Sequence, residues 1–211
     1  DPPRSETITA LKNCENAGIR TVMITGDHPL TAAAVARRIG ILRDGTELIC
    51  GSELEKMSDE ELADKIERYS VFARISPNDK TRIVKAWQSR GETVAITGDG
   101  VEDADALTLA DVGCAIGRHG TDVAKGCADI IISNNSFGSV VSAVKESRGL
   151  FDNIRKSVCY LFSSNFGELL LFIAAMLFSK NAIAPLTAVQ LLWINLLTDS
   201  APAISLSFEK A

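Results

Sequence analysis

The chain has 211 residues and a formal net charge of −5, from 27 acidic and 22 basic side chains. This balance offers no basic stripe to neutralise a phosphate backbone, so it argues against a nucleic-acid-binding protein. The five cysteines show no CxxC spacing, which argues against a disulfide framework or a zinc site and is typical of a cytosolic soluble part. Apolar residues are concentrated after Val158, so we expect a soluble portion followed by a membrane portion.

The chain opens on Asp-Pro-Pro-Arg without an initiator methionine or a signal peptide, so we expect a piece of a longer protein. Strands and helices are then predicted to alternate at short intervals. We expect helices over 5–17, 30–39 and 77–88, a mostly helical acidic segment over 52–68, and strands over 20–24, 70–73, 94–97, 112–116 and 129–132. This alternation predicts an α/β fold built from βαβ units around a parallel sheet.

The first expected strand ends in a polar turn, in the stretch Thr21–Asp27 with sequence TVMITGD. The Thr25 hydroxyl and the Gly26 amide are donors that suit phosphate oxygens. A helix is expected to start just after Asp27, so its amino end would face a bound phosphate. Further along, Lys80 in SPNDKTRIVKAW could neutralise phosphate charge, although such a lysine alone also fits an ordinary helix surface.

The same pattern returns in TVAITGDGVEDADAL, which runs from Thr93 to Leu107. Asp99 follows the strand on a Gly-Asp-Gly turn, and Asp103 lies four residues later at the start of the next helix. Ligands of open α/β sheets bind at the carboxyl ends of the strands, where this carboxylate pair could hold Mg²⁺. A solvated acidic turn is the alternative.

Helical periodicity continues from Ser139 into an apolar segment, Val158–Phe178, that is long enough to cross the roughly 30 Å of membrane hydrocarbon. The basic residues Arg155 and Lys156 precede it, as at a cytoplasmic boundary. After a tight turn at 179–181 on the far side of the membrane, Ala182–Leu206 is expected to return. The predicted organisation is therefore a soluble domain at 1–138, a stalk helix at 139–157 and transmembrane helices at 158–178 and 182–206. A buried helix of a soluble protein is the alternative for the first span.

Polar residues recur at helical spacing within both spans, where they are costly in lipid. Asn165 and Glu168 share one helical face, and Asn195, Thr198 and Asp199 share another. Their oxygens are ligands of the kind that Ca²⁺ prefers, and Pro202 would free backbone carbonyls nearby. Polar contacts that merely hold helices together are the alternative.

These residues carry a family resemblance. The order Thr25, Lys80, Asp99, Asp103 resembles the later motifs of the haloacid dehalogenase superfamily. The sequence motifs DPPR, MITGD, GDGVED, GTDVAK and LLWINLLTD together resemble those of cation-transporting P-type ATPases, most closely calcium pumps of the sarco/endoplasmic-reticulum type and their bacterial relatives. The resemblance implies a partial phosphorylation domain, with a haloacid-dehalogenase-like parallel sheet and helices on both faces, that continues into a transmembrane hairpin.

The resemblance also implies roles in an ATP-dependent reaction. Asp1 and Arg4 would lie near the nucleotide, and Thr25, Gly26 and Lys80 would hold the phosphoryl group. Asp27 would stabilise the loop or the closure of domains, and Asp99 and Asp103 would serve Mg²⁺. The aspartate that attacks ATP belongs to a DKTGT segment that this chain lacks, so the chain alone is expected to be inactive.

In the resembled pumps, the positions matching Asn165, Glu168, Asn195, Thr198 and Asp199 are ion ligands, which favours Ca²⁺ as the transported ion. A heavy-metal pump would carry a Cys-Pro motif that is missing here, whereas sodium-potassium pumps share part of the pattern. The implied protein is a multi-pass membrane protein with a cytoplasmic soluble domain. Its implied partners are the lipid bilayer and the nucleotide-binding, actuator and remaining transmembrane portions of the same pump. A long helix through Tyr160 would couple its two sites.

Two positions depart from the family pattern: Glu102 replaces the usual Asn, and Asp105 the usual Pro. Like charges 4 Å apart repel by about 4 kcal/mol at an effective dielectric of about 20, so we expect weaker phosphate binding, with reduced turnover or altered metal demand. A non-catalytic membrane module derived from a pump is the main alternative function. A free-standing dehalogenase-type phosphatase is disfavoured by the missing nucleophile and the membrane hairpin.

Overall fold

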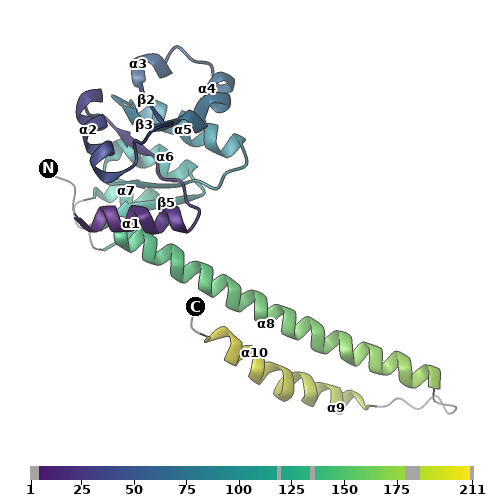
Figure 1. Ribbon diagram of the computed structural model, residues 1–211. Helices are drawn as coiled ribbons and strands as arrows, with labels where there is room; N and C mark the ends of the chain where they lie inside the picture. The colour runs from purple at the N-terminus through teal and green to yellow at the C-terminus, as the bar shows by residue number, and fades with distance from the viewer. Residues whose placement is uncertain (1–4, 118–119, 134–135, 179–185, 210–211) are drawn as a thin grey trace. The chain divides into compact units, whose positions relative to one another are not determined.

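The computed structural model describes residues 5–117, 120–133, 136–178 and 186–209, and the chain forms two compact units, 1–142 and 143–211 (Figure 1). The first unit alternates strands with helices. Its elements are α1 (Ser5–Asn16), β1 (Met23–Thr25), α2 (Pro29–Ile39), β2 (Glu47–Cys50), α3 (Gly51–Leu54), α4 (Asp59–Lys65), η1 (Ile66–Arg68), β3 (Tyr69–Ala73), α5 (Pro77–Ser89), β4 (Ala95–Gly98), η2 (Val101–Asp103), α6 (Ala104–Leu109), β5 (Val112–Ile116), α7 (Asp122–Cys127) and β6 (Ile130–Ile132).

All strand pairs in the first unit are parallel, which confirms the predicted α/β class. The strands form two three-stranded sheets, with orders β1-β3-β2 and β4-β5-β6, where we expected one. Among the described residues no ladder pairs β1 with β4. Each of these two strands therefore has an unpaired edge.

Local sequence signals set the helix ends as expected. Helix α2 starts after His28, whose Nδ1 accepts the Leu30 amide, and it stops at Gly40, which adopts φ 84°. Such a left-handed conformation suits glycine because it lacks a Cβ. Helix α5 begins with Pro77 after a capping box between Ser76 and Asp79. Helix α2 follows the loop with Thr25 and Gly26, and α5 contains Lys80 in its first turn.

Two strands differ from the sequence-based expectation. We expected a strand over 20–24, but β1 covers Met23–Thr25, because the chain is a strand only where it pairs with Val71–Ala73 of β3. We expected no strand after the turn at Asp44, yet β2 forms there by pairing with β3. Strand β3 is buried throughout and lies at the centre of its sheet, so pairing with it defines both neighbours.

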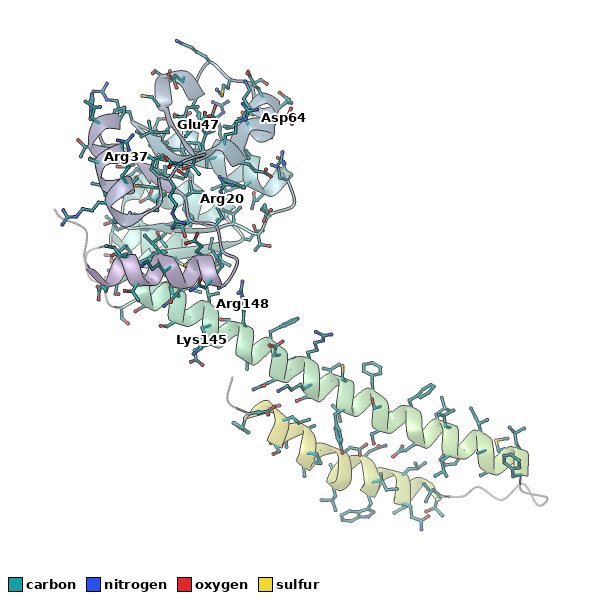
Figure 2. All side chains as sticks on the ribbon, viewed as in Figure 1. Arg20, Arg37, Glu47, Asp64, Lys145 and Arg148 are labelled. Atoms are coloured by element: carbon teal, nitrogen blue, oxygen red, sulfur yellow. The ribbon has the colours of Figure 1, made fainter. Side chains whose placement is uncertain are left out.

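The second unit contains the apolar part of α8 (Phe137–Phe178), followed by α9 (Ala188–Trp193), the π-helix η3 (Ile194–Asp199) and α10 (Ser200–Ser207). Helix α8 is long and apolar enough to cross a membrane. Side chains project from α8 along its whole described length (Figure 2). Many of its large apolar side chains are exposed, including those of Phe162 and Met176.

The predicted second span, 182–206, is not one uniform helix. Where described, it consists of α9, η3 and α10, which follow one another without a gap, and the predicted turn at 179–181 lies outside the described residues. The π-helical stretch lies just before Pro202, which has no N–H to donate to the carbonyl of Thr198 and whose ring crowds that carbonyl. Single π-helical turns of this kind are frequent at functional sites.

Candidate functional site

The centre of the candidate site is a largely buried ion pair between Lys80 and Asp103. The Lys80 Nζ lies 2.5 Å from the Asp103 Oδ1, and the two side chains are 15% and 11% exposed. The other carboxylate oxygen, Oδ2, accepts the backbone amides of Asp99 at 3.2 Å and Gly100 at 3.3 Å. Asp103 therefore fastens the start of α5 to the loop that follows β4.

This arrangement depends on a glycine at the end of β4. A Cβ added to Gly98 would lie 2.5 Å from the Cβ of Asp103 and 2.7 Å from its Oδ2. Real side chains do not approach so closely, since carbon atoms in contact are about 3.5–4.0 Å apart. The sequence indicated a turn and an amide donor at this glycine, but the close packing that requires Gly98 has no signature in the sequence.

The backbone of Asp99 is held on both sides. Its N–H donates to Asp103, and its carbonyl accepts the N–H of Thr121 at 2.9 Å, a contact that sequence analysis missed. The Asp99 carboxylate is exposed and has no hydrogen-bond or ion-pair partner within the described part of the chain. A fixed backbone with an open carboxylate can bind a ligand at the sheet edge.

This geometry suits an ion such as Mg²⁺, which takes few protein ligands, better than an ion that is bound by protein side chains alone. Among the described residues, no three His, Cys, Asp or Glu side chains gather into a metal site. Mg²⁺ is usually held by one or two carboxylates together with water and substrate phosphates. Asp99 can supply such a carboxylate, while Asp103 is already engaged with Lys80 and two amides.

The Thr25 loop meets the segment that carries Lys80 through the backbone. The Ile75 amide donates to the Thr25 carbonyl at 3.2 Å, and the Arg74 amide donates to the Asp27 carbonyl at 3.1 Å. Both donors directly precede α5, whose first turn contains Lys80. Within the described residues no hydrogen bond joins the Thr25 side chain to Lys80 or to the Asp99 carboxylate, so the two segments meet here through backbone hydrogen bonds.

The Thr25 loop keeps hydrogen-bond donors available for phosphate oxygens. The Thr25 Oγ1 accepts the Asp27 amide at 3.1 Å, which leaves the hydroxyl hydrogen to donate elsewhere. Gly26 and Asp27 are exposed. Asp1 and Arg4, the predicted nucleotide contacts, lie outside the described residues.

The second unit has two helical arms, α8 and the segment α9–η3–α10, and each carries a buried carboxylate oxygen without a hydrogen-bond partner among the described residues. These atoms are Oε1 of Glu168 on α8 and Oδ2 of Asp199 at the end of η3. Asp199 is only 3% exposed. A buried carboxylate without a partner is costly, and a bound cation is one way to satisfy it.

The other predicted membrane ligands are less enclosed. Asn165 is exposed, and its amide nitrogen donates to the Leu161 carbonyl at 2.8 Å, which leaves its Oδ1 available. Asn195 is exposed, and the Thr198 side chain lies outside what the structure describes. The unpaired oxygens of Glu168 and Asp199 are therefore the strongest structural features of this second site.

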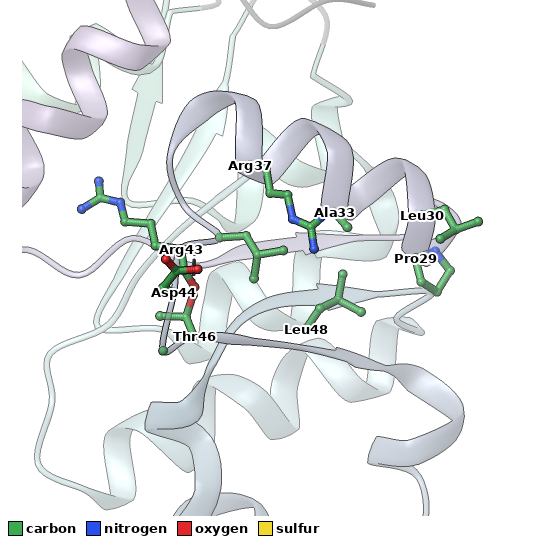
Figure 3. A pocket seen from close by; sticks show the side chains of 10 residues that line it. Pro29, Leu30, Ala33, Arg37, Arg43, Asp44, Thr46 and Leu48 are labelled. Atoms are coloured by element: carbon green, nitrogen blue, oxygen red, sulfur yellow. Dashed lines mark hydrogen bonds between the residues drawn. The ribbon is translucent and has the colours of Figure 1, made fainter.

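A separate hollow of about 560 Å³ lies along α2 and the edge strand β2 (Figure 3). It is lined by Pro29, Leu30, Ala33, Arg37, Leu42, Arg43, Asp44, Gly45, Thr46 and Leu48. None of these is a predicted site residue, so the hollow is separate from the Lys80 and Asp103 chemistry.

Family models match both parts of the chain. The model described as haloacid dehalogenase-like hydrolase matches residues 1–111, and the model described as the C-terminus of cation-transporting ATPases matches residues 183–211.

Individual relatives match across nearly the whole chain. A calcium-transporting ATPase of Bacillus cereus is 50% identical over 99% of this chain and 23% of its own length, and one of Listeria monocytogenes is 50% identical over 100% of this chain and 24% of its own length. The crystal structure of a zinc-transporting PIB-type ATPase in its E2.Pi state aligns with a TM-score of 0.67 at 25% identity, covering 98% of this chain and 27% of that one. The chain thus spans about a quarter of the length of the proteins it matches.

Proposed function

The chain belongs to the haloacid dehalogenase-like hydrolase family, and on this premise we propose that it supplies the phosphoryl pocket and part of the ion site of an ATP-driven Ca²⁺ pump. The matches also confirm the resemblance to cation-transporting P-type ATPases of the calcium-pump type. The observation that carries the proposal is the Lys80–Asp103 ion pair beside the open carboxylate of Asp99.

The proposed phosphoryl pocket uses side chains and backbone together. The Thr25 hydroxyl and the Gly26 amide would donate to phosphoryl oxygens, and the Lys80 ammonium would offset their charge. Asp103 would keep Lys80 in place, and Asp27 would stabilise the loop through its bond to Thr25. Asp99 would hold Mg²⁺, and Asp103 would help by fixing the backbone of Asp99. When bound, Mg²⁺ offsets charge that develops during phosphoryl transfer.

We further propose that a strand from outside these 211 residues completes the sheet. Both β1 and β4 have an unpaired edge, and each ends in a Thr-Gly-Asp turn. A strand ending in a DKTGT segment could pair with both and place its aspartate beside Thr25 and Asp99. The chain by itself would then form no phosphoenzyme. Asp1 and Arg4 would lie near the ATP that supplies the phosphoryl group.

Ca²⁺ is the proposed transported substrate. Asn165, Glu168, Asn195, Thr198 and Asp199 offer oxygen ligands, which Ca²⁺ prefers. The unpaired oxygens of Glu168 and Asp199 support an ion site, and a Na⁺ or K⁺ pump is the alternative that the same ligands allow. In this proposal the protein is multi-pass, its first unit is cytoplasmic, and its partners are lipid and the remaining parts of the pump.

The test is phosphorylation of the full-length protein by ATP in the presence of Mg²⁺. We expect a hydroxylamine-sensitive phosphoenzyme that forms with Ca²⁺ and not with Na⁺, K⁺ or Zn²⁺. Lys80→Gln should abolish its formation, whereas Lys85→Gln, an exposed lysine on the same helix, should not. A phosphoenzyme that needs no Ca²⁺ would overturn the choice of ion, and the absence of any phosphoenzyme would favour the non-catalytic module.

A further inference from the structure

The two arms of the second unit are tied together at one end by polar contacts. We call this group the polar clasp, and it consists of Asn153, Lys156 and Ser157 on α8 with Ala203, Ser207 and Glu209 in and after α10. The Asn153 amide donates to the Glu209 carbonyl, and the Lys156 ammonium pairs with the Glu209 carboxylate. The Ser157 hydroxyl donates to the Ala203 carbonyl at 3.0 Å and lies 3.3 Å from the Ser207 hydroxyl.

The clasp includes two of the three α8 residues that are buried in the part of the helix that the structure describes. The residues of α8 that are buried there are Gly149, Asn153 and Ser157. They are spaced by four, so they form one stripe along the helix. Small and polar residues at this spacing let two helices approach closely and hydrogen-bond in a membrane environment.

The clasp is close in sequence to the proposed ion ligands on both arms. Ala203 lies four residues after Asp199, and Ser157 lies 11 residues before Glu168, or about 16 Å along an α-helix. Between α9 and Ala203 the chain includes the π-helix η3, and Pro202 removes one hydrogen bond from the helical ladder. The arm that carries Asp199 therefore needs an anchor outside that loosened segment.

We propose that Asn153, Lys156 and Ser157 are positioning residues that set the axial register of the two arms and thereby hold Glu168 and Asp199 in place for the ion. This inference rests on the proposed function as an ion pump. The clasp residues do not touch the ion. They act by populating the binding-competent arrangement, and the apparent ion affinity falls in proportion when that population falls.

The test compares variants of Ser157 in the full-length pump. Ser157→Val removes the hydroxyl, whereas Ser157→Thr, which has nearly the same shape as the valine variant, keeps it. We expect Ser157→Val to raise the half-saturating Ca²⁺ for phosphorylation by ATP about threefold to tenfold, the cost of losing one such hydrogen bond, and Ser157→Thr to remain near the wild-type value. Ser163→Val, at an exposed serine of the same helix, is the matched control and should change nothing.

Phosphorylation by inorganic phosphate without Ca²⁺ separates positioning from folding, because it needs a folded pump but no bound ion. It should be unchanged in Ser157→Val. The ion pair offers a second test: Lys156→Glu should weaken Ca²⁺ dependence, and adding Glu209→Lys should restore it. An unchanged half-saturation in Ser157→Val, or a failure of Ser157→Thr to restore it, would overturn the proposal.

A crosslinking experiment distinguishes an error in the clasp proposal from an error in the proposed function. In full-length protein with Cys159→Ser, the pair Ser157→Cys and Ser207→Cys should form a disulfide when membranes are treated with copper phenanthroline. The pair Ser163→Cys and Ser207→Cys should not. A missing crosslink in the first pair refutes the clasp whichever ion is carried, whereas a crosslink in a protein without Ca²⁺-dependent phosphorylation refutes only the calcium pump.

Discussion

Replacing Gly98 by alanine is expected to damage the phosphoryl pocket through a single added methyl group. That carbon would lie 2.5 Å from the Asp103 Cβ, whereas carbon contacts are about 3.5–4.0 Å long, so Asp103 must move by about 1 Å. The amide contacts of its carboxylate are already 3.2 and 3.3 Å long and would break. Overpacking of this kind costs about 1–3 kcal/mol of stability.

The rate of phosphoenzyme formation should fall by more than the loss of stability explains, because Asp103 also holds Lys80. A misplacement of about 1 Å can slow an enzymatic step by about 100-fold. The assay is the rate of phosphoenzyme formation from ATP in the full-length protein, measured beside its thermal unfolding. Gly126→Ala is the matched control, since a Cβ there meets no atom within 4 Å. Alanine in α7 should stabilise the protein by up to about 1 kcal/mol.

The reasoning would be refuted if Gly98→Ala formed phosphoenzyme at the wild-type rate with unchanged unfolding. It would also be refuted if Gly126→Ala slowed phosphorylation as much as Gly98→Ala, because the effect would then not arise from the contact with Asp103.

Three further predictions follow from the same geometry. Asp99→Asn should change stability by less than about 0.5 kcal/mol, because its backbone makes the contacts, but should raise the Mg²⁺ needed for phosphorylation; an unchanged Mg²⁺ titration would contradict its role. Glu102→Asn combined with Asp105→Pro should raise phosphoenzyme levels by removing negative charge, and equal levels would disprove the charge argument. Hydrogen bonds from the Val94 amide and from Gln88 lower the pKa of Asp111. Its carboxylate therefore stabilises the fold above the ordinary pKa of about 3.9, and this contribution is lost as the pH falls through the lower folded value. Asp111→Asn should accordingly make thermal unfolding less dependent on pH below about 4, and parallel curves would rule this out.

The sequence by itself determined the order of the motifs, the alternation of strands and helices, and many helix ends. Ser76 and Pro77 predicted the start of α5, and Gly40 the end of α2, because capping chemistry involves only a few neighbouring residues. The long apolar stretch predicted a helix that could cross a membrane, and α8 is long and apolar enough to do so. The family resemblance likewise followed from short sequence motifs in a fixed order.

Only the tertiary structure decided which of these residues meet. Lys80 and Asp103 are 23 residues apart, and nothing local in the sequence distinguishes their pairing from two solvated charges. The same holds for the packing against Gly98 and for Ser157, whose partner lies 46 residues away. Strand β2 also exists only because β3 offers it an edge. Periodicity and capping depend on residues within one or two helical turns of each other, so the sequence shows them directly. Contacts between distant segments depend on how the whole unit packs.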